Sequence, residues 1–453
     1  MALGVYRSSY LPENLQKKIK IIKGELETEI RKSYFGGNVD VFINKITNGF
    51  LYDMNSQYPT AMLQDMPVGD PILSLENNLD KIFGFVYGEI TAPDEDYLKV
   101  PFIQLRDPKT RDVSCPRGKF KRLIFSEEIK YALKYGYSME VEYCYQFKRG
   151  KGLFTEYVLD HYEIKKANKN SVQKSIAKLF LNSLYGRFGM KDIENISKIV
   201  NKTEAEYLDK NTNVSIISEL TDSKYFIKYK GKINDSIRKL YKKNSLTYAE
   251  GQIINYSKTD LKKSGLFKPK TVPSAVHIAA AISSYARIII NEYKNIPGNP
   301  CIMSDTDSVV LPYPLPDPLV GNGLGQMKLE YKIKKGIFIK KKLYYILTSD
   351  NKEIIRSSGI NSTKLSHESF IKLLQGETIF IERTTFNLDW EEFSINVVNS
   401  NLKLQGLQGD AIIYNNKLIN KNTSEFSYLE IFIYFIFIFS YLSLLILFLY
   451  NIY

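Results

Sequence analysis

Apolar side chains recur every three or four positions in several stretches of the chain, a spacing that predicts helices. The clearest stretches are residues 154–165, 172–185 and 274–293, the last with an alanine-rich side. Residues 11–33 are predicted to form a charged helix, which the paired glycines directly after it then break. The predicted strands are short apolar runs at 39–43, 50–52, 301–303 and 308–311.

Three stretches lack such a pattern. Residues 94–125 are interrupted by prolines and glycine and are expected to form an irregular insertion. Residues 191–270 are rich in Lys, Asn and Ser, which predicts an insertion with little regular structure. Residues 431–450 carry no charge and, at about 30 Å as a helix, could span a bilayer. We favour a fortuitous read-through tail, with a membrane anchor as the alternative.

The charge balance points to a polyanionic partner. The 453 residues include 62 Lys and Arg against 49 Asp and Glu, a net charge of +13. This favours nucleic acid or an anionic membrane surface over a merely solvated basic surface. The three cysteines are far apart and histidines number three, which argues against structural zinc and a disulfide framework. Any metal must therefore sit on carboxylates.

Carboxylates follow two of the predicted strands. Asp53 comes directly after the apolar run 50–52, and Asp305 and Asp307 lie at the turn of the predicted hairpin. Carboxylates displayed between buried strands are costly unless a cation pairs with them. The alternative for the hairpin alone is an ordinary Asx-rich turn.

A second candidate lies on the helix predicted for 172–185. Lys178, Asn182 and Tyr185 stand at i, i+4 and i+7 and therefore share one helical face. A cation, an amide and an aromatic ring together suit a nucleoside triphosphate. Each residue taken alone is equally consistent with a surface lysine or a core tyrosine.

These residues carry a resemblance to family B DNA polymerases, and within them to the protein-primed branch of linear plasmids and phages. Asp53–Pro59 is similar to motif A, Lys178–Gly186 to motif B and Asp305–Ser308 to motif C, in the family's order. Tyr34–Gly37 resembles the family's Tyr-x-Gly-Gly element, and Lys342–Tyr344 its Lys-x-Tyr element.

The resemblance implies an α+β right-hand polymerase that extends a DNA 3′ end with dNTPs by two-metal nucleotidyl transfer. Such transfer needs two cations about 3.5–4 Å apart. Asp53, Asp307 and the backbone carbonyl of Met54 are the expected ligands, with Asp305 as a supporting carboxylate. Hard oxygen donors select Mg²⁺, with Mn²⁺ as a substitute.

The resemblance also implies roles for other residues. It assigns dNTP binding to Tyr58, Lys166, Lys178, Asn182 and Tyr185. It assigns DNA binding to Tyr34, Gly36, Gly37, Ser183, Gly186, Lys342 and Tyr344. Lys165 competes locally with Lys166 for the phosphate role. Tyr58 beneath the sugar would block a ribose 2′-hydroxyl, which favours DNA over RNA synthesis.

The sequence departs from the family in three respects. Gln57 stands in motif A where the family usually has leucine, and Ser304 precedes motif C where an aromatic residue is common. Only 33 residues precede Tyr34, whereas the family's proofreading exonuclease needs more than about 100. We therefore expect a chain without proofreading, as a truncated or split gene product would be.

The expected partners are template and primer DNA, dNTPs and a terminal protein that primes synthesis. No cleavable targeting segment is visible, so a mitochondrial, organelle-encoded product is expected. The alternatives are a noncatalytic DNA-binding remnant and, resting only on the tail, a membrane protein. The expected divisions are palm with motif A at 1–60, palm with a terminal-protein-type insertion at 61–153, fingers at 154–190, a second insertion at 191–270, palm with motif C at 271–348, thumb at 349–415 and the apolar tail at 416–453.

Overall fold

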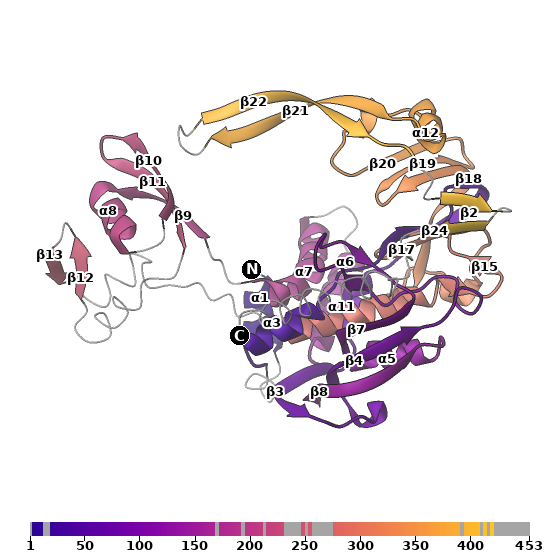
Figure 1. Ribbon diagram of the computed structural model, residues 1–453, viewed down its shortest axis with the longest axis horizontal. Helices are drawn as coiled ribbons and strands as arrows, with labels where there is room; N and C mark the ends of the chain where they lie inside the picture. Colours follow the sequence, from indigo (N-terminus) through magenta and orange to yellow (C-terminus); the bar gives the residue numbers. More distant parts are fainter. Residues whose placement is uncertain are drawn as a thin grey trace, which may run out of the picture. The chain divides into compact units, whose positions relative to one another are not determined.

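The fold comes from a computed structural model, in which the chain forms two compact units (Figure 1). The first unit comprises residues 1–185, 276–377 and 405–453, and the second comprises 186–275 and 378–404. The structure describes residues 2–11, 19–167, 172–191, 195–211, 214–230, 246–249, 252–255, 275–389, 394–407, 411–414 and 417–420.

A seven-stranded antiparallel sheet is the centre of the first unit. Its spatial order is β1 (Val39–Val41), β16 (Met303–Asp305), β17 (Ser308–Leu311), β2 (Lys45–Met54), β18 (Met327–Lys340), β19 (Leu343–Thr348) and β20 (Glu353–Ser357). All four strands predicted at 39–43, 50–52, 301–303 and 308–311 are confirmed in part or whole. This order brings segments that are distant in sequence next to β2.

Helix α11 (Val276–Asn291) and short helix α4 (Gln57–Met62) pack together beside this sheet. Nearly all of α11 is buried, on more than its alanine-rich side. Ile290 joins one core cluster with Tyr52, Met54 and Val309 of the sheet. The end of β2 is therefore packed against α11.

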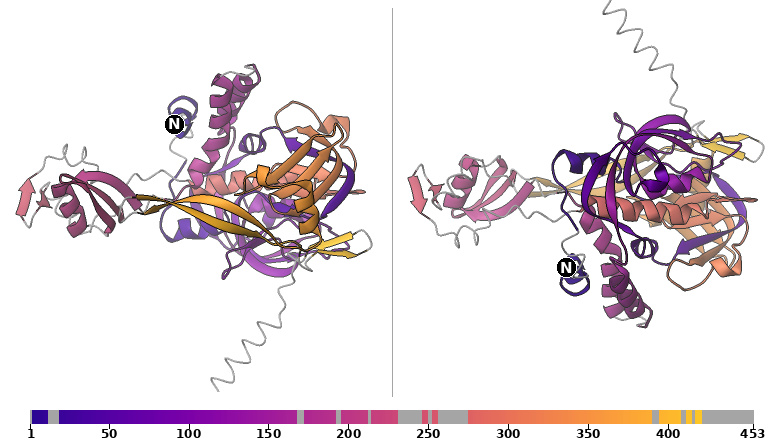
Figure 2. Two further views of the ribbon diagram at one scale, coloured as in Figure 1. Left: turned by 90° about the horizontal axis from the view of Figure 1, so that it is seen from above. Right: turned by 90° about the horizontal axis from the view of Figure 1, so that it is seen from below.

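The predicted helices 154–165 and 172–185 are confirmed as α6 (Thr155–Ala167) and α7 (Val172–Gly189). Figure 2 shows this pair standing out from the rest of the first unit. The helix predicted over 11–33 is wrong for residues 19–24, because α3 covers only Glu25–Lys32 and begins after Gly24, whose φ is +72°. Residues 12–18 lie outside the described part.

A four-stranded antiparallel sheet fills most of 61–153. Its order is β3 (Met66–Ser74), β8 (Ser138–Gly150), β4 (Gly84–Ala92) and β7 (Gly118–Phe125). The irregular insertion expected at 94–125 is therefore wrong at its end. Strands β5 (Leu105–Arg106) and β6 (Val113–Ser114) are short, but β7 pairs with β4 along its whole length. Phe120 and Ile124 of β7 bury their side chains with helix α5 (Ser126–Leu133), and this burial outweighs the nearby turn residues.

Further small elements complete the first unit. They are α1 (Ala2–Val5), the π-helical turn η1 (Tyr6–Tyr10), the 3₁₀ turns η2 (Leu79–Lys81), η3 (Asp317–Leu319) and η4 (Ser362–Lys364), helix α12 (His367–Leu374), and the two-stranded pairs β14 (Asn295–Ile296) with β15 (Asn299–Pro300) and β23 (Ala411–Tyr414) with β24 (Lys417–Asn420).

The second unit contains more regular structure than expected for 191–270. Helix α8 (Lys202–Asn211) packs on the sheet β10 (Val214–Thr221), β11 (Lys224–Lys230), β9 (Asn195–Asn201) around buried Leu208 and Ile227. This small core is enough to order a segment with weak periodicity. Two hairpins follow, β12 (Leu246–Ala249) with β13 (Gln252–Asn255), and β21 (Ile379–Asp389) with β22 (Ser394–Leu404).

The expected thumb at 349–415 is divided between the units, because β20 and α12 belong to the first and the β21–β22 hairpin to the second. The apolar run 431–450 lies outside the described residues. Among the residues that are described, no helix is both long and apolar enough to cross a bilayer.

Candidate active site

The antiparallel register of the central sheet brings motifs A and C together. Asp53 near the end of β2 pairs with Ser308 of β17, and Asp305 at the end of β16 pairs with the same serine. The Met54 N–H donates to the Asp307 carbonyl at 2.8 Å. Asp53 on β2 and Asp307 in the turn between β16 and β17 are thus neighbours at one end of the sheet.

The turn of motif C has an unusual backbone. Thr306 has φ +61°, a left-handed conformation that costs energy for a β-branched residue. Its N–H donates to the Asn38 carbonyl at 2.9 Å, and the Asp307 N–H donates to the Asp305 carbonyl at 2.7 Å. These bonds hold Asp305 and Asp307 on either side of a rigid turn.

Gly37 has a structural reason to be glycine. A Cβ atom at this position would lie 2.6 Å from Thr306 Cγ2 and 2.9 Å from Thr306 Cα. The Tyr-x-Gly-Gly element therefore packs directly on the motif C turn. A Cβ at Gly36 would meet no atom within 4 Å, so close approach of DNA there stays a prediction, as do the DNA contacts of Tyr34 and Gly37.

The charge of the carboxylate pair is only partly compensated by nearby lysines. Burial, followed by the charges of Asp307 and Glu330, raises the pKa of Asp53 to about 6, although Lys328 and Lys178 oppose the shift. Burial and the charge of Asp305 also raise the pKa of Asp307. A site that penalises two adjacent carboxylates is one that gains by binding cations.

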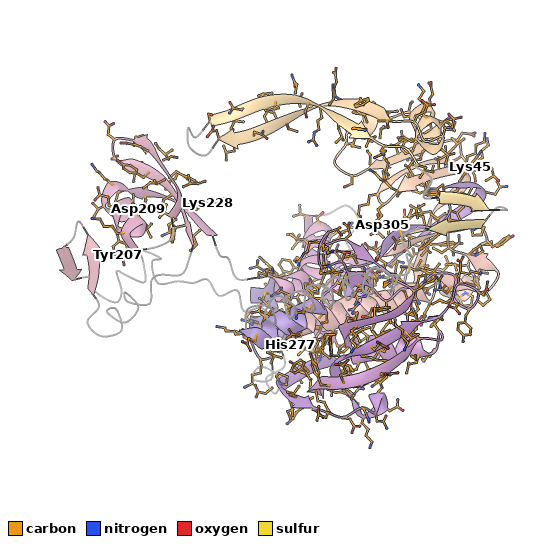
Figure 3. The ribbon with its side chains drawn as sticks, in the orientation of Figure 1. Lys45, Tyr207, Asp209, Lys228, His277 and Asp305 are labelled. Carbon is orange, nitrogen blue, oxygen red and sulfur yellow. The ribbon has the colours of Figure 1, made fainter. Side chains whose placement is uncertain are left out.

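Asp305, which is labelled in Figure 3, differs from Asp53 and Asp307 because a lysine side chain is paired with it. Lys342 Nζ contacts both of its carboxylate oxygens, at 2.9 and 3.0 Å. Lys342 stands between β18 and β19 with φ +57°. Tyr344, on β19, is partly buried beside Phe338. The primer-binding roles of Lys342 and Tyr344 stay predictions.

Tyrosines from two motifs form one wall of the site. The rings of Tyr58 on α4 and Tyr185 on α7 stack at 4.0 Å between centroids and 8° between planes. Burial, and secondarily Tyr185, raise the pKa of Tyr34, so the Tyr-x-Gly-Gly element lies close to the same pair. Tyr185 of the predicted helical face thus contacts motif A, whereas Asn182 is exposed, and Ser183 and Gly186 are partly exposed, on the same helix.

Lysines of α6 and α7 place positive charge near the carboxylates of Asp53 and Asp307. Lys165 Nζ donates to Ser56 Oγ at 2.8 Å, and burial, Lys178 and Lys174 lower its pKa while Asp53 opposes them. Lys178 is exposed on α7, and its charge reaches both Asp53 and Asp307. Lys166 is also exposed, and the structure puts Lys165 rather than Lys166 against motif A. The phosphate role of Lys166 stays a prediction that this geometry does not favour.

A buried ion pair behind the site was not foreseen from the sequence. Arg287 of α11 and Glu128 of α5 are 3% and 1% exposed and are joined by two bonds of 2.6 Å. Ser284 donates to Glu128 at 2.8 Å, and Arg287 Nη1 donates to the carbonyls of Phe35 and Gly36 at 2.8 and 3.2 Å. The pair therefore anchors the Tyr-x-Gly-Gly element. No local pattern signals it, since its members come from distant segments.

The available donors suit a hard cation. Asp53 and Asp307 offer carboxylate oxygens, and Met54, directly after Asp53, offers a backbone carbonyl. Within the described ranges, no group of three or more His, Cys, Asp or Glu side chains is arranged as a metal cluster. An oxygen-only pair favours Mg²⁺ or Mn²⁺ over zinc.

The central antiparallel sheet with its carboxylates, and the projecting helix pair with its lysines, are consistent with the α+β fold expected of a right-hand polymerase. The chain belongs to the type B DNA polymerases of organellar and viral type, whose family model matches residues 1–268. The family inferred from the motifs is thereby confirmed.

Known relatives support this membership. A probable DNA polymerase of Agaricus bitorquis is 42% identical over 402 residues, which cover 87% of this chain and 49% of that protein. One of Podospora anserina is 33% identical over 441 residues, which cover 93% and 35% respectively. The chain thus spans about half the length, or less, of these relatives.

Solved structures show the same fold. Phi29 DNA polymerase, in a ternary complex with primer–template DNA and incoming nucleotides, matches with a TM-score of 0.61 at 18% identity. The match covers 88% of this chain and 66% of the Phi29 chain. The expected α+β right-hand fold is confirmed by this likeness.

Proposed function

We propose that this chain catalyses templated extension of a DNA 3′ end by dNTPs, with release of pyrophosphate. The observation that carries the proposal is the pair of Asp53 and Asp307. They are brought together by sheet register, made costly by burial, and faced by the charge of Lys178. Family membership and the DNA-bound Phi29 relative support it.

Asp53, Asp307 and the Met54 carbonyl would hold the divalent cations of this reaction. When bound, such cations lower the pKa of the attacking 3′-hydroxyl and neutralise the leaving pyrophosphate. The protein prepares for them by keeping two carboxylates adjacent on a rigid sheet. Asp305 is paired with Lys342 and would serve as a supporting carboxylate rather than as a cation ligand.

The remaining residues bind and orient the nucleotide. Lys165 and Lys178 present ammonium groups toward motif A, where a triphosphate would lie. The stacked rings of Tyr58 and Tyr185 offer a flat apolar wall for the sugar and base. A bulky ring at Tyr58 leaves little room for a ribose 2′-hydroxyl, which favours DNA synthesis.

Three biological proposals rest on family likeness alone. They are priming by a terminal protein, replication of a linear plasmid or organellar element, and a mitochondrial location. The priming proposal fails if no terminal protein accepts a first dNMP in a reconstituted reaction. Noncatalytic DNA binding is the competing function, because a net charge of +13 also suits a protein that only binds DNA.

Primer extension separates these functions. The chain is incubated with a singly primed DNA template, Mg²⁺ and dNTPs, beside the Asp53→Ala variant. Extension by the parent chain alone is expected, with DNA binding by both proteins equal within a few fold, because phosphate contacts are untouched. Binding without extension by the parent would overturn the polymerase proposal and favour noncatalytic DNA binding.

A further inference from the structure

Gln57 is a polar residue in the interior of the site. It begins α4 directly before Tyr58 and is 2% exposed. The family that this chain resembles usually has leucine at this place in motif A. A buried glutamine is expensive unless its amide is hydrogen-bonded, so its contacts indicate what it does.

The Gln57 amide links three parts of the palm. Its Nε2 donates to the Thr306 carbonyl in the motif C turn at 3.0 Å and to the Ala286 carbonyl of α11 at 2.9 Å. Both acceptors are carbonyl oxygens, which identifies the atom facing them as nitrogen. Motif A is thereby tied to the motif C turn and to the helix behind it.

The bond to Thr306 acts at the strained point of motif C. Thr306 is left-handed, its N–H is held by the Asn38 carbonyl, and its side chain packs on Gly37. Gln57 holds the carbonyl of the same residue. A left-handed threonine persists only where its surroundings over-determine it, and Gln57 supplies one of these restraints directly beside Asp307.

Stability alone does not account for this glutamine. Its Oε1 is buried and has no hydrogen-bond partner among the described residues, a loss of about 1–3 kcal/mol for an unsatisfied group. Leucine or methionine would fill a similar volume and avoid that cost, but would leave the carbonyls of Thr306 and Ala286 without this donor. An unfavourable buried acceptor retained beside the catalytic turn is expected where function needs the donor on the same amide.

We propose that Gln57 is a positioning residue, which holds the motif C turn so that Asp307 faces Asp53 at the spacing that cations require. This inference rests on the proposed polymerase function for its catalytic consequence. The geometric part, that Gln57 sets the turn, stands on the hydrogen bonds alone.

The test compares Gln57→Leu and Gln57→Met, which remove the donor but keep an apolar side chain of similar volume. Gln64→Leu, the same change at an exposed position shortly after α4, is the matched control. Three quantities are measured on the full chain: the single-turnover rate of dNMP addition with the dNTP KM, amide hydrogen exchange at residues 305–308, and Mn²⁺ affinity. The affinity is read by electron paramagnetic resonance with a dideoxy-terminated primer–template and the next dNTP.

Both Gln57 variants are expected to lose about tenfold or more in maximal rate, because small misplacements of reacting groups are costly. The dNTP KM should change by less than about threefold. Exchange at 305–308 should accelerate and Mn²⁺ affinity should fall several fold, while the melting temperature changes by no more than about 3 °C. Gln64→Leu should match the parent throughout.

Unchanged exchange and Mn²⁺ affinity in both Gln57 variants would overturn the inference and leave Gln57 as a space-filling residue. Failure of the polymerase proposal gives a different result. In that case the parent chain does not extend primers, yet the Gln57 variants still differ from it in exchange at 305–308.

Discussion

Replacing Asp53 by asparagine should make the metal-free protein more stable while abolishing extension. Asp53 carries a charge that burial, Asp307 and Glu330 all disfavour. Asparagine has nearly the same shape and no charge. Removal of one of the two repelling carboxylates should therefore favour folding, and removal of a cation ligand should stop nucleotidyl transfer.

The magnitude follows from the pKa. A pKa of about 6 in place of the ordinary 3.8 corresponds to about 3 kcal/mol at neutral pH for a fully buried group. The Asp53 side chain is only partly buried, and solvent screens part of its interaction. The expected gain in free energy of unfolding is therefore about 1–2 kcal/mol, or a rise in melting temperature of about 1–3 °C for a unit of this size.

The gain should depend on pH in one direction. Because folding raises the Asp53 pKa, its protonation stabilises the parent chain fully below about pH 4, and this contribution is lost as the pH rises through about 6. Asparagine does not titrate. The stability difference between variant and parent should be near zero at about pH 4 and complete above about pH 7.

Thermal unfolding in EDTA across this pH range measures the effect. Asp96→Asn, at a fully exposed carboxylate, is the control and should differ little from the parent at any pH. Addition of Mg²⁺ should then stabilise the parent more than Asp53→Asn. If Asp53→Asn melts below the parent in EDTA at pH 8, or if its gain is the same at pH 5, the buried charge of Asp53 does not destabilise the fold.

Three further substitutions test the surroundings of the site. Gly37→Ala brings a methyl group within 2.6 Å of Thr306 and should reduce single-turnover extension about tenfold or more, with DNA affinity nearly unchanged. Glu128→Gln leaves the Arg287 guanidinium buried without its counter-charge and should cost about 3–5 kcal/mol in urea unfolding. Lys165→Met should raise the dNTP KM about tenfold in steady-state extension, because a phosphate-facing charge is lost.

Each substitution has a matched control. Gly4→Ala adds a methyl group where no atom lies within 4 Å, and Glu163→Gln neutralises an exposed carboxylate. Both controls should behave as the parent. If Gly37→Ala changes extension no more than Gly4→Ala does, the close packing of Gly37 on Thr306 is unimportant. If Glu128→Gln changes stability no more than Glu163→Gln does, the ion pair with Arg287 is unimportant. If Lys166→Met, rather than the Lys165 variant, raises the dNTP KM, the phosphate role belongs to the lysine predicted from the family.

Local structure was largely predictable. Helical periodicity located α6, α7 and α11, and short apolar runs located the strands of motifs A and C. Each of these patterns is formed by residues only a few positions apart, so it can be recognised without the fold. Strand β7 was missed, since its sequence is flanked by turn residues and its stability comes from pairing with β4. The choice between Lys165 and Lys166 likewise depended on how α6 is rotated against Ser56.

The chemistry available to this protein can be read from its residues: carboxylates that follow apolar strands, and a cation, an amide and an aromatic ring on one helical face. How these groups meet depends on the fold. The register that sets Asp53 beside Asp307, the Arg287–Glu128 pair behind Phe35, and the Gln57 amide on Thr306 all join segments far apart in the chain. Their geometry depends on long-range pairing and burial, which neighbouring residues along a sequence do not encode.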